Sequence, residues 1–236
     1  MNDTIKVGIW QPYFMPYIGY FQLINSVDKF VIYDNIEYTK KGWINRNRIL
    51  MNGTDKQFTI NLTKDSDYLD VRDRYISEVY DRKKLLNQIT AAYSKAPFYN
   101  DAFPIIRECI EYPDNNLFNY IYNSVLKISR HIGIDTDIIV SSTLNIGKEY
   151  KGQDKVLAIC KSLNATDYTN SIGGKDLYNR EEFERLGIRL HFHKTDSDIC
   201  YKQFKNEFVP SLSIIDVMMF NSLEEIREML NRYTVL

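Results

Sequence analysis

Hydrophobic positions near the start of the chain predict a strand, a helix and a second strand in that order. Ile5–Trp10 is a short apolar run, and Lys29–Asp34 is a continuous one of the kind typical of a buried parallel strand. Between them, the apolar residues of Gly19–Ser26 favour a short helix. A βαβ unit indicates an α/β fold with a mostly parallel, Rossmann-like sheet.

The middle of the chain changes to a helical pattern. Residues 35–53 are polar and aromatic without a clean period, whereas Lys56–Leu62 alternates as a strand does. Helices are expected over residues 85–93, before Pro97, and over Phe103–Ile110. A third helix has its cap within residues 114–116 and its stop at Gly133, and its apolar stripe consists of Leu117, Ile121, Val125, Ile128 and Ile132. We expect one domain over residues 1–236, with a mainly helical portion at about 70–133.

Strands and helices alternate again in the last hundred residues. Strands are expected at residues 136–142, 166–170 and 188–193, with a helix at 153–163. In the third of these strands the inward positions are Ile188, Leu190 and Phe192, and the outward positions are Arg189, His191 and His193. The pairs Asn179 with Glu182 and Ser222 with Glu225 predict capping boxes. Two helices, at 211–220 and 222–233, close the chain.

Composition excludes several classes of protein. The net charge is −1, so no global basic field favours DNA binding. Three cysteines, odd in number and far apart, form neither a disulfide framework nor a zinc site. His191 and His193 share a strand face but lack a third ligand, so we expect no metal site. No signal peptide and no membrane span is apparent, and a cytoplasmic location fits best.

Two segments should meet where parallel strands end. The turn from Gln11 to Tyr20 and the pair Asp34-Asn35 both follow predicted strands, and open α/β sheets bind ligands beyond the carboxyl ends of their strands. Gln11 either braces the turn or contacts a ligand. Asp34 either caps a loop or serves as a site acid, and we favour the acid because polar residues follow it.

Two further segments carry chemistry. In "WINRNR", an extended backbone would place Asn45 and Asn47 on one face and Arg46 and Arg48 on the other. Arginine suits carboxylate or phosphate groups, although the sequence alone slightly favours a solvated surface hairpin. In "SIGGKDLY", the sequence Gly173-Gly174-Lys175 after a strand could form an anion nest, but it lacks the Walker A spacing.

The N-terminal segment closely resembles the signature of the WbqC-like family of bacterial surface-polysaccharide gene clusters. The residues that carry the likeness are Gln11-Pro12-Tyr13, Pro16, Gly19-Tyr20, Asp28, Phe30, Asp34, Tyr38, Trp43 and Asn45-Arg46-Asn47. The likeness extends more loosely through "SIGGKDLY" and "YKQF". Asn35 departs from the pattern, because an aspartate pair is common there. The resemblance implies a glycine or other aminoacyl transferase acting on amino sugars.

We therefore expect a transferase that acylates the amine of a nucleotide-linked amino sugar in O-antigen, lipopolysaccharide or capsule biosynthesis. The acyl donor is an aminoacyl-tRNA, a carrier thioester or an adenylate made with ATP and magnesium. The predicted catalytic residues are Asp34 as general base, with Arg46 and Lys175 stabilising anionic charge. The predicted substrate-binding residues are Gln11, Tyr13, Tyr20, Asn35, Tyr38, Trp43, Asn45, Asn47, Gly173, Gly174 and Tyr178.

Two other functions fit the same residues. The first is a non-catalytic sugar- or nucleotide-binding accessory protein of a polysaccharide assembly complex. The second is a nucleotidyltransferase-like enzyme, because Tyr17-Ile18-Gly19-Tyr20 occupies the place of the H-x-G-H motif of such enzymes. Tyrosines lack the positive charge of histidines, so this analogy is at the level of the fold alone.

Overall fold

The fold is built around a mostly parallel sheet. The structure, a computed structural model, describes residues 4–205 and 207–236. Its sheet has the strand order β5-β2-β1-β6-β7-β8, in which β8 alone runs antiparallel to its neighbour. The strands are β1 (Lys6–Trp10), β2 (Lys29–Ile32), β5 (Asp137–Val140), β6 (Asp167–Ser171), β7 (Arg189–Thr195) and β8 (Tyr233–Val235). The predicted α/β class with a Rossmann-like parallel sheet is confirmed.

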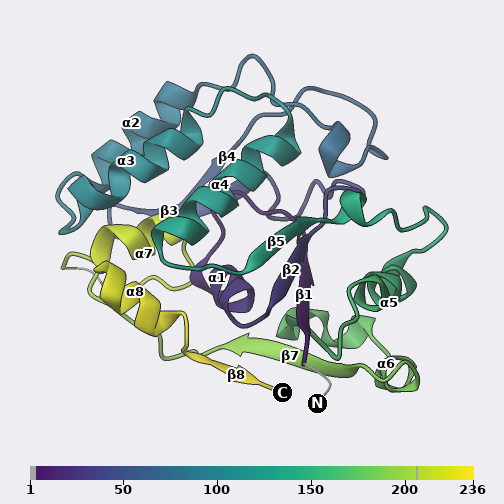
Figure 1. The fold of residues 1–236 in the computed structure, drawn as a ribbon. Coiled ribbons are helices and arrows are strands. Elements are labelled where there is room, and N and C mark those ends of the chain that lie inside the picture. The colour runs from purple at the N-terminus through teal and green to yellow at the C-terminus, as the bar shows by residue number, and fades with distance from the viewer. Residues whose placement is uncertain (1–3, 206) are drawn as a thin grey trace.

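Helices cover both faces of this sheet, as Figure 1 shows. α1 (Ile18–Asn25) connects β1 to β2 on one face, and α5 (Gly152–Ser162) and α6 (Arg180–Arg185) lie on the opposite face. Side chains along β1 and β2 alternate between the two layers, since successive residues of a strand point to opposite faces. Val7, Ile9 and Val31 contribute to the core under α5 and α6, whereas Phe30 and Ile32 pack under α1.

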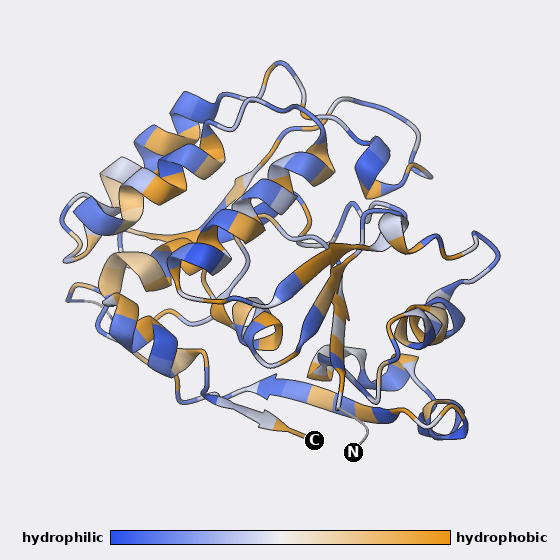
Figure 2. Cartoon of the chain, viewed as in Figure 1, coloured by the Kyte–Doolittle hydropathy of each residue, from blue (hydrophilic) through white to orange (hydrophobic). Residues whose placement is uncertain are grey.

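A long connection from β2 to β5 carries most of the remaining helices. It contains the antiparallel hairpin β3 (Arg46–Met51) and β4 (Thr54–Thr59), a short 3-10 turn (Val71–Asp73), and the helices α2 (Arg82–Tyr93), α3 (Tyr99–Ile110) and α4 (Leu117–His131). α7 (Ile214–Phe220) and α8 (Leu223–Met229) return to the same side. Figure 2 shows that the apolar colour follows the central strands and one side of these helices. Their stripes therefore form a common core.

Helix ends agree with the sequence pattern in most places. Asn116 accepts a hydrogen bond from the amide of Asn119 and caps α4, and Gly133 ends that helix with a φ of 85°. Ser222 and Glu225 form the predicted capping box. The predicted box of Asn179 with Glu182 is half formed, because Asn179 accepts from the amide of Glu181 while Glu182 pairs with Arg185.

Three sequence predictions about strands were wrong. The hairpin that the sequence offered as an alternative for "WINRNR" is present as β3 and β4, but β4 begins and ends earlier than the predicted strand at Lys56–Leu62. The tail forms β8, which the closing helical pattern did not indicate. His193 is 2% exposed instead of pointing to solvent, because Tyr233 of β8 covers its ring at a centroid distance of 4.5 Å. Across the described residues, no helix is long and apolar enough to cross a membrane.

Candidate functional site

The strand order creates a switch point between β1 and β6. From β1 the chain moves to β2 on one side, whereas β6 lies on the other side of β1. Loops that leave the carboxyl ends of these strands diverge there, which opens the crevice where α/β sheets bind ligands. Two adjoining cavities occupy this edge of the sheet, and both are lined by Ile36 and Glu37.

The larger cavity, named the basic cavity, has a volume of about 670 Å³ and lies at the ends of β2 and β5 and the start of α5. Its polar lining includes Asn35, Ser142 and Asn145, and its charged lining residues are Glu37, Asp70, Arg72, Lys148, Lys151 and Lys155. Cationic residues outnumber acidic residues in this lining. An excess of positive charge around a hollow favours an anionic ligand.

Lys155 is a partly buried cation of the basic cavity. Its Nζ donates to the carbonyl oxygen of Asn35 at 2.7 Å and to Asn35 Oδ1 at 2.8 Å, and it lies 5.1 Å from the centroid of the Tyr33 ring. Burial lowers the pKa of Lys155, and the carboxylates of Asp70 and Asp34 partly oppose that shift. An ammonium group has three donors. Two are held by Asn35, so one remains for another acceptor.

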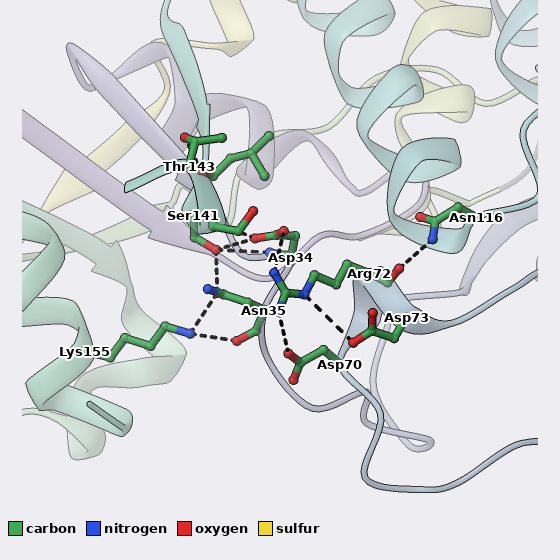
Figure 3. A network of polar contacts seen from close by, with 11 residues as sticks. Asp34, Asn35, Asp70, Arg72, Asp73, Asn116, Ser141, Thr143 and Lys155 are labelled. Atoms are coloured by element: carbon green, nitrogen blue, oxygen red, sulfur yellow. Dashed lines mark hydrogen bonds and ion pairs between the residues drawn. The ribbon is translucent and has the colours of Figure 1, made fainter. Parts of the chain in front are cut away.

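Arg72 is already balanced by carboxylates. Its guanidinium lies 4.0 Å from Asp34, 3.8 Å from Asp70 and 3.9 Å from Asp73. Figure 3 shows this guanidinium between the three acids, with Lys155 on the far side of Asn35. Carboxylates of the protein therefore compensate most of the positive charge of Arg72. The charge of Lys155 is not compensated in this way by the described residues.

Asp34 joins the ends of β2 and β5. Its Oδ1 accepts from the amide of Ser142 at 2.9 Å and lies 2.8 Å from the hydroxyl of Ser141 (Figure 3). That hydroxyl is also 2.7 Å from Asn35 Oδ1. Asp34 is 4% exposed and lines neither cavity. This geometry is that of a loop cap, the alternative to the predicted site acid, and its effect is to place Asn35 at the edge of the basic cavity.

The second cavity, named the aromatic cavity, has a volume of about 430 Å³ and lies at the switch point itself. Its ring and amide lining consists of Trp10, Gln11, Tyr13, Tyr33, Asn170 and Tyr178. Burial raises the pKa of Tyr13, Tyr33 and Tyr178, so their hydroxyls stay protonated at neutral pH. Flat rings with hydroxyl and amide groups suit a sugar or a base.

Gly173 and Gly174 complete the aromatic cavity from the loop after β6. They lie in a 3-10 helix, Ile172–Leu177. A Cβ on Gly174 would lie 2.8 Å from the amide nitrogen of Asn170, whose own hydrogen bond reaches the hydroxyl of Tyr178 at 2.9 Å. A larger residue at 174 would displace that bond, so glycine preserves the shape of this wall.

Six predicted substrate-binding residues line these two cavities: Gln11, Tyr13, Asn35, Gly173, Gly174 and Tyr178. A separate hollow of about 280 Å³ lies on the other side of Tyr13 and is bordered by Trp43 and Asn47. Trp43 is 43% exposed and stacks with Arg48 at 5.5 Å. Asn47 is buried, because its amide donates to the carbonyl oxygen of Met15 at 2.7 Å.

The structure does not bring the other predicted site residues into either cavity. Tyr20 is fully buried, stacks on Trp10 and donates to the carbonyl oxygen of Gln11. Asn45 is also buried and joins Tyr38 to the chain near β4. The predicted residues outside the lining of the basic and aromatic cavities are Tyr20, Asp34, Tyr38, Trp43, Asn45, Arg46, Asn47 and Lys175.

Arg46 and Lys175 face away from the cavities for different reasons. The guanidinium of Arg46 donates to the carbonyl oxygen of Lys40 and holds the loop before β3. Lys175 is exposed on the 3-10 helix after β6, of which Gly173, Gly174 and Leu177 line the aromatic cavity. The alternation predicted for "WINRNR" is nevertheless present, since Asn45 and Asn47 are buried whereas Arg46 and Arg48 are partly exposed.

Most of the lining residues that sequence reasoning did not assign to the site come from distant segments, and Glu37 lies two positions after Asn35. These residues include Glu37, Asp70, Arg72, Lys148, Lys151, Lys155 and Asn170. One signal for two of them exists: Lys151 and Lys155 flank the start of α5, where the helix dipole disfavours cations. Asp154 also lies in the first turn of α5, but among the described residues it forms no salt bridge with either lysine.

The histidines and cysteines lie outside this site. His191 Nε2 is 2.8 Å from Asp167 Oδ1, and burial lowers the pKa of His193 to about 4. Burial raises the pKa of Cys109 and of Cys160 to about 12, which leaves both thiols protonated. In the part of the chain that the structure describes, no three His, Cys, Asp or Glu side chains group as a metal site.

Similarity to known proteins extends over the segments that form both cavities. The model of the WbqC-like protein family matches residues 11–228, which includes the linings of both cavities apart from Ile9 and Trp10. The chain is also similar to a protein of Mycobacterium tuberculosis (strain ATCC 25618 / H37Rv) named "Uncharacterized protein Rv1507c". The two are 29% identical over 219 residues, which cover 92% of this chain and 93% of that protein.

Proposed function

The chain belongs to the WbqC-like protein family, and on that premise we propose that it is a transferase that acylates the amine of a nucleotide-linked amino sugar. The acyl group is an amino acid such as glycine, and the product serves O-antigen or capsule biosynthesis. The observation that carries the proposal is the aromatic cavity at the switch point, with Glu37 on the border that it shares with the basic cavity. Free thiols at Cys109 and Cys160 support a cytoplasmic site of action.

Sugar binding follows from the lining of the aromatic cavity. Trp10 and Tyr13 offer aromatic rings, which pack edge to face at a centroid distance of 6.1 Å. Gln11 and Asn170 offer donors and acceptors for the hydroxyl groups of a sugar. A ring held between flat and amide groups is oriented as well as bound, which is the requirement for directing one amine.

In the proposed chemistry, the sugar amine attacks the carbonyl carbon of an activated acyl donor. A C–N bond forms, and the bond from the acyl carbon to its carrier oxygen or sulfur breaks. Glu37 accepts the proton that the nitrogen loses, and the leaving group takes up a proton from the general acid that forms. We place this role at Glu37 in preference to Asp34, because Glu37 lines both cavities and Asp34 caps a loop.

An assay with a panel of nucleotide-linked amino sugars tests the proposal. Each sugar is offered glycine in three forms: with ATP and magnesium, as glycyl-tRNA, and as a carrier thioester. Mass spectrometry detects the amide product. Glu37→Gln is expected to lower kcat by about 10²–10⁴-fold with little change in KM, the usual contribution of a general base.

Glu111→Gln is the matched control, because Glu111 is an exposed acid at the end of α3. The proposal fails if no sugar is acylated by any donor, or if Glu37→Gln keeps the full rate. Sugar binding without turnover would indicate a non-catalytic accessory protein of a polysaccharide assembly complex. Pyrophosphate release that depends on the sugar and on no acyl group would indicate a nucleotidyltransferase.

A further inference from the structure

We propose that the basic cavity binds a diphosphate group, with Lys155 donating to a phosphate oxygen beside the start of α5. The inference names the site that would hold the diphosphate of the nucleotide-linked sugar, and to that extent it rests on the proposed function. The observations that support it concern the charges of the cavity, the geometry of Lys155 and the free amides of α5.

In the described part of the chain, none of the three lysines of the basic cavity forms a salt bridge. Across residues 4–205 and 207–236, no carboxylate oxygen lies within 4.0 Å of the Nζ atoms of Lys148, Lys151 or Lys155. Lys148 and Lys151 are exposed, but Lys155 is partly buried. Taking a cation out of water costs free energy that a bound counter-charge restores. An anion bound beside Lys155 would supply that counter-charge.

The geometry of Lys155 directs one donor into the cavity. Asn35 holds the ammonium group through two acceptors, its carbonyl oxygen at 2.7 Å and its Oδ1 at 2.8 Å. Asn35 itself is fixed by the hydroxyl of Ser141 at 2.7 Å (Figure 3). Both acceptors are neutral, so they orient the ammonium group without cancelling its charge. The group is thus pre-organised for an anion, which reduces the entropic cost of binding.

The start of α5 adds uncharged donors to the same cavity. Lys151, the residue that precedes the helix, has no side-chain cap, and Gly152 lines the cavity with a φ of 50°. The first amides of a helix have no partner one turn earlier. They carry partial positive charge and bind phosphate oxygens in many proteins. Among the described residues, the amides of Gly152 and Gln153 make no backbone hydrogen bond. The amide of Asp154, in contrast, donates to the carbonyl oxygen of Lys151. The first amides of α5 and the ammonium group of Lys155 can therefore bind the same phosphate group.

The charge of the side chains that line the cavity indicates a ligand with about two negative charges. Within the lining, Arg72 and Asp70 are 3.8 Å apart and largely offset each other, while Asp34 and Asp73 approach Arg72 from outside the lining. The remaining charged lining residues are three lysines and Glu37, an excess of two positive charges. A single carboxylate would leave one of these uncompensated, whereas a diphosphate would not. The basic cavity also borders the aromatic cavity at Ile36 and Glu37, so a ring joined to a diphosphate can span both.

Calorimetric titration with inorganic pyrophosphate and with UDP tests the assignment on the full chain. Both ligands should bind the wild type, and both should bind about 10–100-fold more weakly to Lys155→Ala, the range for one lost charged hydrogen bond. Lys155→Gln keeps a donor for Asn35 and should lose affinity similarly, which separates charge from local packing. Lys175→Ala is the matched control, because Lys175 is an exposed lysine outside the cavity. Uridine, which has no phosphate, should bind equally to wild type and to Lys155→Gln.

The inference is overturned if pyrophosphate and UDP do not bind, or if they bind Lys155→Gln and wild type with equal affinity. Its failure is distinguishable from failure of the proposed function. Phosphate binding that depends on Lys155, without acyl transfer from any donor, would refute the transferase and keep the diphosphate site. Acyl transfer with unchanged kcat and KM in Lys155→Gln would keep the transferase and refute the site.

Discussion

Asn35 controls the electrostatic surroundings of Lys155. It presents two neutral oxygen acceptors to the ammonium group at 2.7 and 2.8 Å. The WbqC-like pattern commonly has a second acid at this position, whereas this chain has an amide. With an amide, the ammonium charge stays available to a ligand. With a carboxylate, a salt bridge would offset that charge inside the protein.

Asn35→Asp is therefore expected to raise the pKa of Lys155 and to weaken pyrophosphate binding about tenfold, the effect of roughly 1.4 kcal/mol. The new carboxylate would lie within hydrogen-bond distance of Nζ. Titration of the Lys155 signal by NMR gives the pKa, and calorimetry gives the affinity. Asn164→Asp, an exposed position at the opposite end of α5, should change neither quantity. Unchanged affinity in Asn35→Asp would contradict this account.

At the scale of elements, the aromatic turn between β1 and α1 is held by segments far along the chain. The amide of Asn47 in β3 and the hydroxyl of Ser213 both donate to the carbonyl oxygen of Met15, each at 2.7 Å. Met15 has a φ of 44°, a strained value for a residue with a side chain. The turn therefore depends on β3 and α7, and its rings divide between core and cavity: Tyr20 is buried, whereas Tyr13 lines the site.

Gly19 permits the close approach of α1 to β7, and its replacement tests that packing. A Cβ at this position would collide with Thr195 Oγ1 and with the ring of Tyr17. Gly19→Ala is expected to lower the free energy of unfolding by about 1–3 kcal/mol, the usual cost of overpacking. Urea denaturation measures the change. Gly173→Ala is the control, because the nearest atom to its Cβ would be 3.8 Å away, and equal loss in both variants would refute the packing explanation.

At the scale of the whole molecule, buried polar side chains connect the layers. Asp216 of α7 accepts from the hydroxyls of Tyr93 and Tyr201, both at 2.8 Å, and from Gln203 at 2.6 Å. Burial raises the pKa of Asp216. At the β8 edge of the sheet, His193 of β7 is buried and the ring of Tyr233 of β8 covers it. Groups like these couple the stability of the entire fold to pH.

His193 makes global stability fall in mildly acidic solution. Its pKa is about 4 in the folded protein and ordinarily about 6.5, so the unfolded chain binds more protons between these values. The free energy of unfolding should be fully retained above pH 6.5, fall between pH 6.5 and 4, and receive no further change from this group below pH 4. The loss is at most about 3 kcal/mol. His193→Phe should flatten this segment of the stability curve, measured by urea denaturation at each pH, and parallel curves would disprove the assignment.

Local pattern was sufficient for the secondary structure around β1, α1 and β2. The continuous apolar run at Lys29–Asp34 and the capping box at Ser222 depend on neighbouring residues only, and both predictions were confirmed. β8 and the burial of His193 were not predicted. A strand of three residues is stable only when it pairs with another strand, and here that partner is β7. The buried face of β3 was also difficult to predict, because it depends on contact with the distant turn at Met15.

Some residues of the candidate site were predictable from local sequence, and others were not. Gln11, Tyr13, Asn35 and the glycines at 173 and 174 follow directly after strands, so sequence alone placed them at the ligand-binding edge. Lys155 is separated from Asn35 by 120 positions, and Ser141 from Asp34 by 107. A local pattern carries no information about such pairings.

The sequence by itself determined the α/β class, the order of most elements and the edge of the sheet where ligand chemistry belongs, because hydrophobic period and strand ends are local properties. Tertiary structure alone decided which side chains at that edge are free. In the folded chain, Asp34 and Asn47 hold loops and Tyr20 is buried in the core. Lys155 lies beside Asn35. The physical reason is that each polar group either finds a partner within the fold or stays available to a ligand, and distant segments supply those partners.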